Sequence, residues 1–276
     1  MGLSGTVLRR VKWLPDGILL DGVRVTTRTT ASPGQVLSVL VGDAEVKSGI
    51  LPAVGPLNII YEDDDFLVIN KAPGVPVHPG PGHYDDTLGN FLMKYYETSG
   101  ILADFHPIHR LDKGTSGLMT VAKYPHAQEK LKNQLHTGAF RRTYLAVCTR
   151  TPQPPDGTVD APIGRVDGSL IAQQVQQDGK RAVTHYRTLS TAPGASLIEL
   201  TLDTGRTHQI RVHMAHLGCP LVGDFLYGTE ERERIARPAL HSWKLSLRHP
   251  VTEKELSFTA PLPQDMAALL EISAEK

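Results

Sequence analysis

The feature that most constrains this chain is the nine-residue segment 109–117, with the sequence HRLDKGTSG. It follows a short extended run, residues 105–108, and leads into residues 117–122, which are apolar enough to form a buried strand. Such an arrangement fixes a glycine-containing turn at the end of a sheet, where polar side chains can project into a cleft. An isolated aspartate is usually a solvated or capping carboxylate, but these flanks favour a functional position for Asp112.

Segment 109–117 resembles the catalytic signature H-R-L-D-x-x-T-S-G of the RluA family of pseudouridine synthases, and it matches every specified position. Two further family motifs are similar to residues 70–79 (NKAPGVPVHP) and 204–213 (TGRTHQIRVH), and GDFLYG follows at 223–228. The resemblance covers roughly residues 57 to 262. It implies an isomerase that converts specific uridines of structured ribosomal or transfer RNA to pseudouridine, in steps of rRNA or tRNA processing.

The element pattern predicts an α+β fold with a mixed, largely antiparallel central sheet and flanking helices. Residues 87–97 carry apolar side chains at helical spacing, with Asp86 or Thr87 as a capping residue, and residues 140–147 have the composition of a strand. Residues 151–180 are rich in Pro, Gly, Asp and Gln, which indicates a loop-rich insertion. Together with the resemblance, this predicts a pseudouridine synthase catalytic domain over residues 57–276.

The first 50 residues are expected to form a separate small module. Residues 8–11 suit a short helix, and residues 17–25 and 34–41 read as strands, with a turn at Asp21-Gly22. The module resembles the later half of an S4-type RNA-binding domain, truncated because too few residues precede Gly17 for the usual pair of helices. RNA binding through this module and a simple β cap remain alternatives.

The resemblance implies a role for each residue of the expected site. Asp112 would be the catalytic residue, either as a nucleophile or as a base, and its carboxylate must be ionised for both. Arg110 would fill the space vacated by the flipped uridine, and Tyr144 would lie against the flipped base. Arg211 would pair with Asp112. The implied substrate-binding set is Arg110, Tyr144, Arg211, His109 and Thr115. His78 is expected to be a solvated loop residue, with lining of the site as the alternative.

Composition limits the partners and the compartment. The chain has 29 Lys and Arg against 29 Asp and Glu, so a local basic region must serve any RNA. Residues 129–150 supply one, with Lys130, Lys132, Arg141, Arg142 and Arg150 against Glu129. With two cysteines, no signal peptide and no membrane-spanning run, a cytoplasmic monomer is expected, with RNA as its partner. Uridine isomerisation needs no cofactor and no metal, so none is predicted.

Three other functions deserve comparison with this one. A metal-dependent hydrolase would use His208, His213 and His216, but on a helix positions 208 and 213 are about 140° apart. A serine hydrolase would use Ser116 with His109 and Asp112, yet the segment lacks a complete nucleophile elbow. A non-catalytic RNA-binding protein of the same fold would lack the acidic residue or its partners, which are present.

Overall fold

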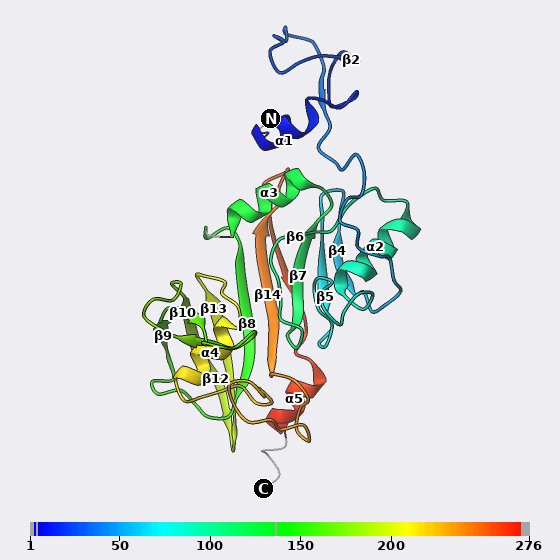
Figure 1. Cartoon of the computed structure of the whole chain (residues 1–276). Helices are drawn as coiled ribbons and strands as arrows, with labels where there is room; N and C mark the ends of the chain where they lie inside the picture. The colour runs from blue at the N-terminus through cyan, green and yellow to red at the C-terminus, as the bar shows by residue number, and fades with distance from the viewer. Residues whose placement is uncertain (1–2, 4, 136, 272–276) are drawn as a thin grey trace.

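The computed structural model describes residues 3, 5–135 and 137–271, and a ten-stranded sheet is its main feature (Figure 1). Among these residues the β7–β14 pair is parallel and the other pairs of this sheet are antiparallel, which confirms the predicted mixed sheet. The path is β4-β5-β7-β14-β8-β13-β12-β9, with β15 beside β14 and β6 beside β7. The strands are β4 (Ile59–Glu62), β5 (Phe66–Lys71), β6 (His106–Pro107), β7 (Ser116–Ala122), β8 (Arg141–Cys148), β9 (Asp156–Asp160), β12 (Val183–Ala192), β13 (Ala195–Leu202), β14 (Leu240–Arg248) and β15 (Glu255–Thr259).

Helices cover both faces of this sheet. They are α2 (Leu88–Ser99), α3 (Pro125–Gln134), α4 (Gln209–His216) and α5 (Gln264–Glu271). On β5, Leu67 and Ile69 belong to the hydrophobic core that includes residues of α2 and α4, whereas Phe66 and Val68 belong to the core that includes residues of α3. Successive strand residues point to opposite faces, so α2 and α4 cover one face and α3 the other. None of the described helices is long and apolar enough to cross a membrane.

The start of α2 is fixed by a reciprocal capping box. The Thr87 side chain accepts from the backbone N–H of Asn90, and the Asn90 side chain accepts from the backbone N–H of Thr87. The Asn90 amide also donates to the carbonyls of Leu51 and Tyr84, at 2.7 and 2.8 Å. Thr87 is thus the capping residue of the two that the sequence offered, and the cap also ties the preceding segments to the helix.

The segment before the main sheet forms a small sheet of its own. Helix α1 (Gly5–Val11) precedes strands β1 (Ile18–Leu20), β2 (Val23–Arg24) and β3 (Leu37–Val39), which pair in the order β2-β1-β3. The predicted helix and hairpin are therefore present. Residues 43–48 are bonded to the larger body, because Asp43 Oδ2 lies 2.6 Å from His106 Nε2, and Asp104 accepts the backbone N–H groups of Lys47 and Ser48.

The prediction that residues 151–180 form a loop-rich insertion was wrong in one respect. Strand β9 extends the main sheet, and β10 (Ile163–Arg165) pairs with β11 (Gln173–Val175) as a separate hairpin. The strands are short and the Pro, Gly and Asp residues of their turns dominate the local composition, so periodicity did not reveal them. The β10–β11 hairpin is important below because Gln173 contacts the site.

Candidate active site

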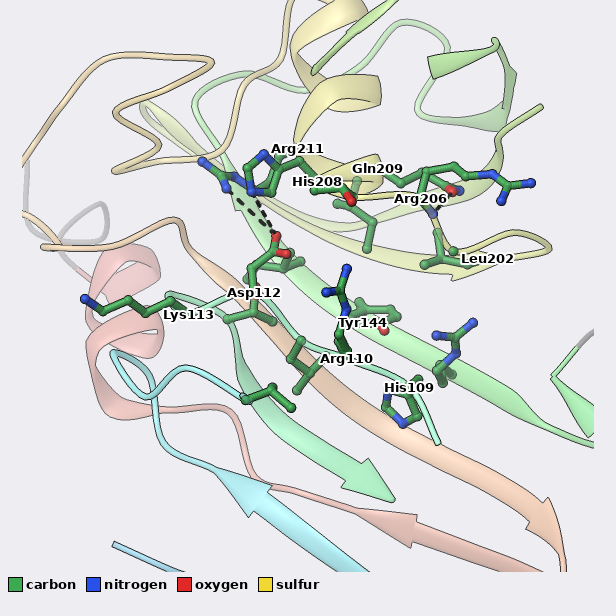
Figure 2. A pocket seen from close by; sticks show the side chains of 18 of the residues that line it. His109, Arg110, Asp112, Lys113, Tyr144, Leu202, Arg206, His208, Gln209 and Arg211 are labelled. Carbon is green, nitrogen blue, oxygen red and sulfur yellow. Dashed lines mark hydrogen bonds and ion pairs between the residues drawn. The ribbon is translucent and has the colours of Figure 1, made fainter. Parts of the chain in front are cut away.

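The three motif segments, which are far apart in the sequence, meet around one cavity of about 780 Å³. Segments 76–79, 108–113 and 205–211 form most of its wall, and β8 contributes Arg142 and Tyr144. Figure 2 shows the carboxylate of Asp112 facing His208 and Arg211 across part of this cavity. Residues from different strands, loops and α4 therefore converge on one hollow with both apolar and polar lining, which is the usual form of a catalytic or binding site.

Segment 109–117, here named the Asp112 turn, is held by its own backbone and by a close approach to β14. The Thr115 N–H donates to the Asp112 carbonyl at 3.0 Å. Gly117 has φ 109°, and a Cβ built there would lie 2.2 Å from the Ser242 carbonyl oxygen. The signature glycine is therefore required sterically, because any side chain would push the start of β7 away from β14.

Two buried cations bond the backbone of the Asp112 turn. Lys71, 1% exposed, donates from Nζ to the carbonyls of Ala72, Val75 and Lys113 at 2.8, 2.9 and 3.2 Å. Burial lowers the pKa of Lys71 to about 7, and the nearby charge of Arg237 adds to this effect. The three carbonyl acceptors match the three donors of an ammonium group, so Lys71 joins segment 71–75 to the turn.

Arg237 is the second of these cations. Its Nη1 donates to the Gly114 carbonyl at 3.2 Å and to the Leu240 carbonyl at 3.1 Å. Its other donors form a two-bond pair with Asp265 of α5, at 2.7 and 2.8 Å. The side chain of Arg237 is thus oriented from one end and holds the turn at the other. Sequence analysis singled out neither Lys71 nor Arg237; Lys71 lies in the 70–79 motif, whereas no motif marked Arg237.

Arg211 lies between two carboxylates. Its Nε and Nη2 donate to Asp224 at 2.7 Å each, and its Nη1 lies 3.8 Å from Asp112 Oδ2. Burial opposes the charge of Arg211, but the hydrogen bonds and charge of Asp224 outweigh it and raise the pKa. The two-bond pair fixes the guanidinium plane, so the free edge faces Asp112. Asp224, in the 223–228 motif, was not predicted as a site residue.

His208 approaches the same carboxylate oxygen. Its Nε2 lies 3.9 Å from Asp112 Oδ2, and its Nδ1 lies 2.9 Å from the Tyr227 hydroxyl. The Tyr227 ring also packs under Arg211, with the guanidinium carbon 5.0 Å from the ring centre. His208 and Tyr227 are thus site residues that sequence reasoning missed, although both lie in quoted motifs.

The other expected residues occupy different depths of the site. Arg110 is exposed at the rim, Tyr144 is buried in the wall, and burial raises the pKa of Tyr144. Thr115 is buried, and its backbone closes the turn. His78 is largely exposed and also borders the cavity, so both of its alternatives hold in part.

His109 also lines the cavity, although its ring is mostly buried. It is buried against Phe140, with 5.7 Å between ring centres, and neither ring nitrogen has a hydrogen-bond partner among the described residues. Burial lowers the pKa of His109 to about 3. The ring is therefore neutral and packs against Phe140 at the first position of the turn.

Comparison with known proteins identifies the family. A family model described as RNA pseudouridylate synthase matches residues 65–216. This chain belongs to the RNA pseudouridylate synthase family. It is 41% identical over 271 residues to the uncharacterized RNA pseudouridine synthase YjbO of Bacillus subtilis, covering 98% of this chain and 95% of the relative. It is 39% identical over 262 residues to the ribosomal large subunit pseudouridine synthase D of Nitrosomonas europaea, covering 92% and 76%.

Solved structures agree with this assignment. The human RNA pseudouridylate synthase domain containing 4 has a TM-score of 0.62 at 29% identity, covering 78% of this chain and 92% of that one. The human RNA pseudouridylate synthase domain containing 1 has a TM-score of 0.63 at 26% identity, covering 80% and 96%. The chain is an RNA pseudouridine synthase, an isomerase with RNA as its substrate.

The hydrolase alternatives do not fit the geometry of this synthase. Ser116 Oγ lies 2.9 Å from His241 Nδ1, whereas neither nitrogen of His109 has a hydrogen-bond partner among the described residues. His213 uses its nitrogens on Thr184 and on the Ala161 carbonyl, at 2.9 Å each. Within the described residues, the group with metal-like spacing is instead Asp63, Asp65 and His249, on another part of the fold.

Proposed function

We propose that this synthase isomerises uridine in ribosomal RNA through Asp112, with the uridine flipped into the cavity. The observation that carries the proposal is the position of Asp112, whose partly exposed carboxylate borders the cavity and faces two donors on one of its oxygens. Isomerisation breaks the bond from C1′ to N1 of the base and forms one from C1′ to C5. The C5 proton leaves and N1 gains a proton, so atoms balance without a cofactor.

Arg211 places a positive charge beside the carboxylate of Asp112. Either role, attack on the nucleotide or removal of a proton, requires the charged form. The charge of Arg211 lies 3.8 Å away, and Asp224 holds that arginine in place. An opposite charge at this distance attracts the carboxylate and can hold it in place for either role.

Base flipping gives Arg110 and Tyr144 their proposed tasks. A uridine inside a helical stack is out of reach, and extracting it costs a few kcal/mol. Arg110 is exposed at the rim, where its planar guanidinium can enter the vacated space. Tyr144 lies in the wall, where stacking on the base is worth about 1–3 kcal/mol. His109 and Thr115, which belong to the turn, would help to fix its shape and would contact the backbone of the RNA substrate.

The large ribosomal RNA is the substrate class that the relatives favour. The synthase D proteins of Nitrosomonas europaea and Vibrio cholerae carry this substrate in their names, at 39% and 41% identity. Transfer RNA is the alternative that the experiment below must separate. We expect the synthase to act as a monomer in the cytoplasm.

The N-terminal module, residues 1–50, is proposed to bind RNA in the manner of a truncated S4 domain. Trp13 is 76% exposed, and Lys12 Nζ lies 5.0 Å from its ring centre. An exposed aromatic ring beside basic side chains suits stacking on unpaired bases and contact with phosphates. Arg9, Arg10 and Arg24 supply further positive charge on the same module.

The proposed function is tested by replacing Asp112→Asn, which keeps the shape of the side chain and removes its charge. Transcripts of large-subunit ribosomal RNA and of transfer RNA, labelled with tritium at uridine C5, are incubated with each protein, and released tritium is measured. We expect release from the ribosomal transcript with the native enzyme and none detectable with the variant. RNA affinity and melting temperature should be nearly unchanged.

The two parts of the proposal can fail separately. Substantial tritium release by the Asp112→Asn variant would remove Asp112 from its role. Release from transfer RNA alone would keep the chemistry and replace the substrate class. Loss of RNA binding and of thermal stability together would mean that Asp112 serves the fold instead of the reaction.

A further inference from the structure

His208 has an unusual backbone conformation for its position. It precedes α4 with φ 57° and ψ 18°, in the left-handed region, and its side chain makes no capping bond to the helix. Residues with a Cβ seldom adopt this region, and those that do are concentrated at functional sites where surrounding contacts hold them. Here the contacts that hold the side chain are Tyr227 on one ring nitrogen and Asp112 near the other.

The contacts of Tyr227 favour one of the two tautomers of His208. The Tyr227 hydroxyl accepts the backbone N–H of Gln173 at 2.9 Å, so its own hydrogen is directed elsewhere. The Nδ1 of His208, also 2.9 Å away, is an acceptor in position to receive it. In the neutral ring the proton then resides on Nε2, the nitrogen that faces Asp112. Burial lowers the pKa of His208, against the opposing charge of Asp112, which agrees with a neutral ring.

The two donors near Asp112 approach the same oxygen. His208 Nε2 lies 3.9 Å and Arg211 Nη1 3.8 Å from Oδ2. Both separations are longer than a hydrogen bond, and catalytic hydrogen bonds in unliganded enzymes often shorten when the substrate binds. Two donors on Oδ2 would fix the rotation of the carboxylate and leave Oδ1 for the nucleotide.

We propose that His208 is a positioning residue for Asp112, and that its Nε2–H, set by the chain Gln173–Tyr227–His208, closes on Oδ2 when uridine enters the cavity. The proposal rests on the proposed function of Asp112. The proposal also assigns a structural role to the β10–β11 hairpin, because the backbone N–H of Gln173 in β11 begins the chain of hydrogen bonds. The hairpin therefore helps to orient the Asp112 carboxylate through Tyr227 and His208.

Three substitutions separate this role from a purely structural one. His208→Asn tolerates the left-handed backbone and keeps an acceptor for Tyr227, but has no donor that reaches Asp112. His208→Gln has a longer side chain whose amide can reach the carboxylate. Tyr227→Phe keeps the ring under Arg211 and removes the hydroxyl alone. His216→Ala, on an exposed residue of the same helix, is the matched control.

The measurement is the single-turnover rate at saturating RNA between pH 5 and 8.5, with melting temperature and RNA affinity recorded for each protein. For His208→Asn we expect the rate at pH 7.5 to fall about 10- to 100-fold, the size of one lost charge-assisted hydrogen bond. The shape of its pH profile should match that of the native enzyme, because the proposed role needs the Nε2–H as a donor and no proton transfer from the ring. His208→Gln should recover part of the rate, Tyr227→Phe should lose a few-fold, and His216→Ala should match the native enzyme.

Other patterns overturn the proposal. Disappearance of an acid limb in His208→Asn would mean that His208 itself is the titrating base. A native rate and profile in His208→Asn would remove any role, and a rate loss accompanied by a lower melting temperature would make the role structural. The rate of each variant is compared with that of Asp112→Asn. If Asp112→Asn is inactive and His208→Asn is normal, only the positioning role fails; if Asp112→Asn is active, the Asp112 mechanism fails.

Discussion

The Asp112 turn and the N-terminal segment, residues 3–42, are built in opposite ways. Around the turn, the buried cations Lys71, Arg211 and Arg237 each have at least two short bonds to backbone or carboxylate groups. In the N-terminal segment, Trp13 and Val23 are 76% and 68% exposed, and none of the hydrophobic core clusters of the described residues includes a member before Ile50.

This difference predicts which property a substitution changes in each region. A buried charge with fixed partners keeps atoms in place, and removing one partner leaves the other charge uncompensated. The N-terminal segment has only a small set of buried apolar side chains among its described residues, so it should add little to stability, and its exposed surface is available for RNA. These buried side chains are Val7, Val11, Ile18 and Leu20. Substitutions of these buried cations or of their partners should therefore reduce both stability and turnover, whereas changes in the N-terminal segment should reduce binding.

The largest loss of stability is expected from Asp224→Asn. This change leaves the buried Arg211 without its anion, and breaking a buried pair in this way costs about 3–5 kcal/mol of unfolding free energy. Arg211 would also lose the contact that orients it toward Asp112, so single-turnover rates should fall by at least about tenfold. Chemical denaturation and tritium release measure the two effects.

The matched control for Asp224 is the surface pair Arg187–Glu199, whose contact is 2.9 Å but whose arginine is 65% exposed. Glu199→Gln should change stability by no more than about 1 kcal/mol and leave turnover unaltered. Equal effects of the two substitutions would contradict the contrast between fixed buried pairs and solvated ones.

A smaller effect is expected from Lys71→Met. The substitution fills most of the space and leaves the carbonyls of Ala72, Val75 and Lys113 without their donor. Each unsatisfied buried carbonyl costs about 1–3 kcal/mol, part of which is recovered because the desolvation of a buried ammonium is also removed. A net loss of about 2 kcal/mol, with slower turnover, is therefore the expected result.

Lys94→Met, on the exposed side of α2, is the control for Lys71. It should leave both denaturation and turnover unchanged. If Lys71→Met slowed turnover without any loss of stability, Lys71 would act in the chemistry and not through the backbone of the turn.

The sequence predicted the residues of the Asp112 turn better than the buried side chains that bond its backbone. Asp112 and Arg211, from two of the motif segments, border one cavity together with Tyr144, which the family resemblance had assigned to the strand over residues 140–147. The local sequence of Arg237 gave no signal, since its partners Gly114 and Asp265 are separated from it by 123 and 28 positions. Long-range pairs of this kind depend on the fold, so composition and spacing do not reveal them.

The fold was predictable where periodicity was long and failed where strands were short. Residues 87–97 gave a helical stripe and a cap, and α2 begins after Thr87. The strands β10 and β11 have three residues each, within a turn-rich stretch, which is too short for alternation to appear. The same limit hid Gln173, whose contact with Tyr227 is a backbone bond.

The pH dependence of stability should distinguish the buried histidines from the exposed ones. Burial lowers the pKa of His109 to about 3 and that of His241 to about 4, from an ordinary value of 6.5. Between pH 6.5 and about 4 the unfolded chain binds more protons at these residues than the folded protein does. The free energy of unfolding should therefore fall as the pH drops through this window.

His109→Phe isolates one of these contributions, because the nitrogens of His109 have no partner among the described residues. Urea denaturation should show equal stability for the variant and the native enzyme at pH 7.5, within about 0.5 kcal/mol. At pH 5 the variant should be more stable by about 1–2 kcal/mol, since it has no ring to protonate on unfolding. A loss of stability at both pH values would show instead that a ring nitrogen of His109 makes a hydrogen bond that stabilises the folded protein.

The smallest effect on stability and turnover is expected from removing the N-terminal segment. Deletion of residues 1–42 retains Asp43 and its contact with His106, along with the bonds of residues 47 and 48 to Asp104. The melting temperature and the single-turnover rate at saturating RNA should change little, because every residue around Asp112 remains.

RNA affinity at moderate salt should fall, and the slope of log Kd against log salt should become shallower by about 1–2, since fewer phosphates are neutralised. Trp13→Ala should reproduce part of the affinity loss without changing that slope, because stacking on a base releases no counterion. Unaltered affinity after the deletion would leave the segment as a β cap that does not contact RNA, and a collapse of the melting temperature would show that the two regions are more alike than their burial indicates.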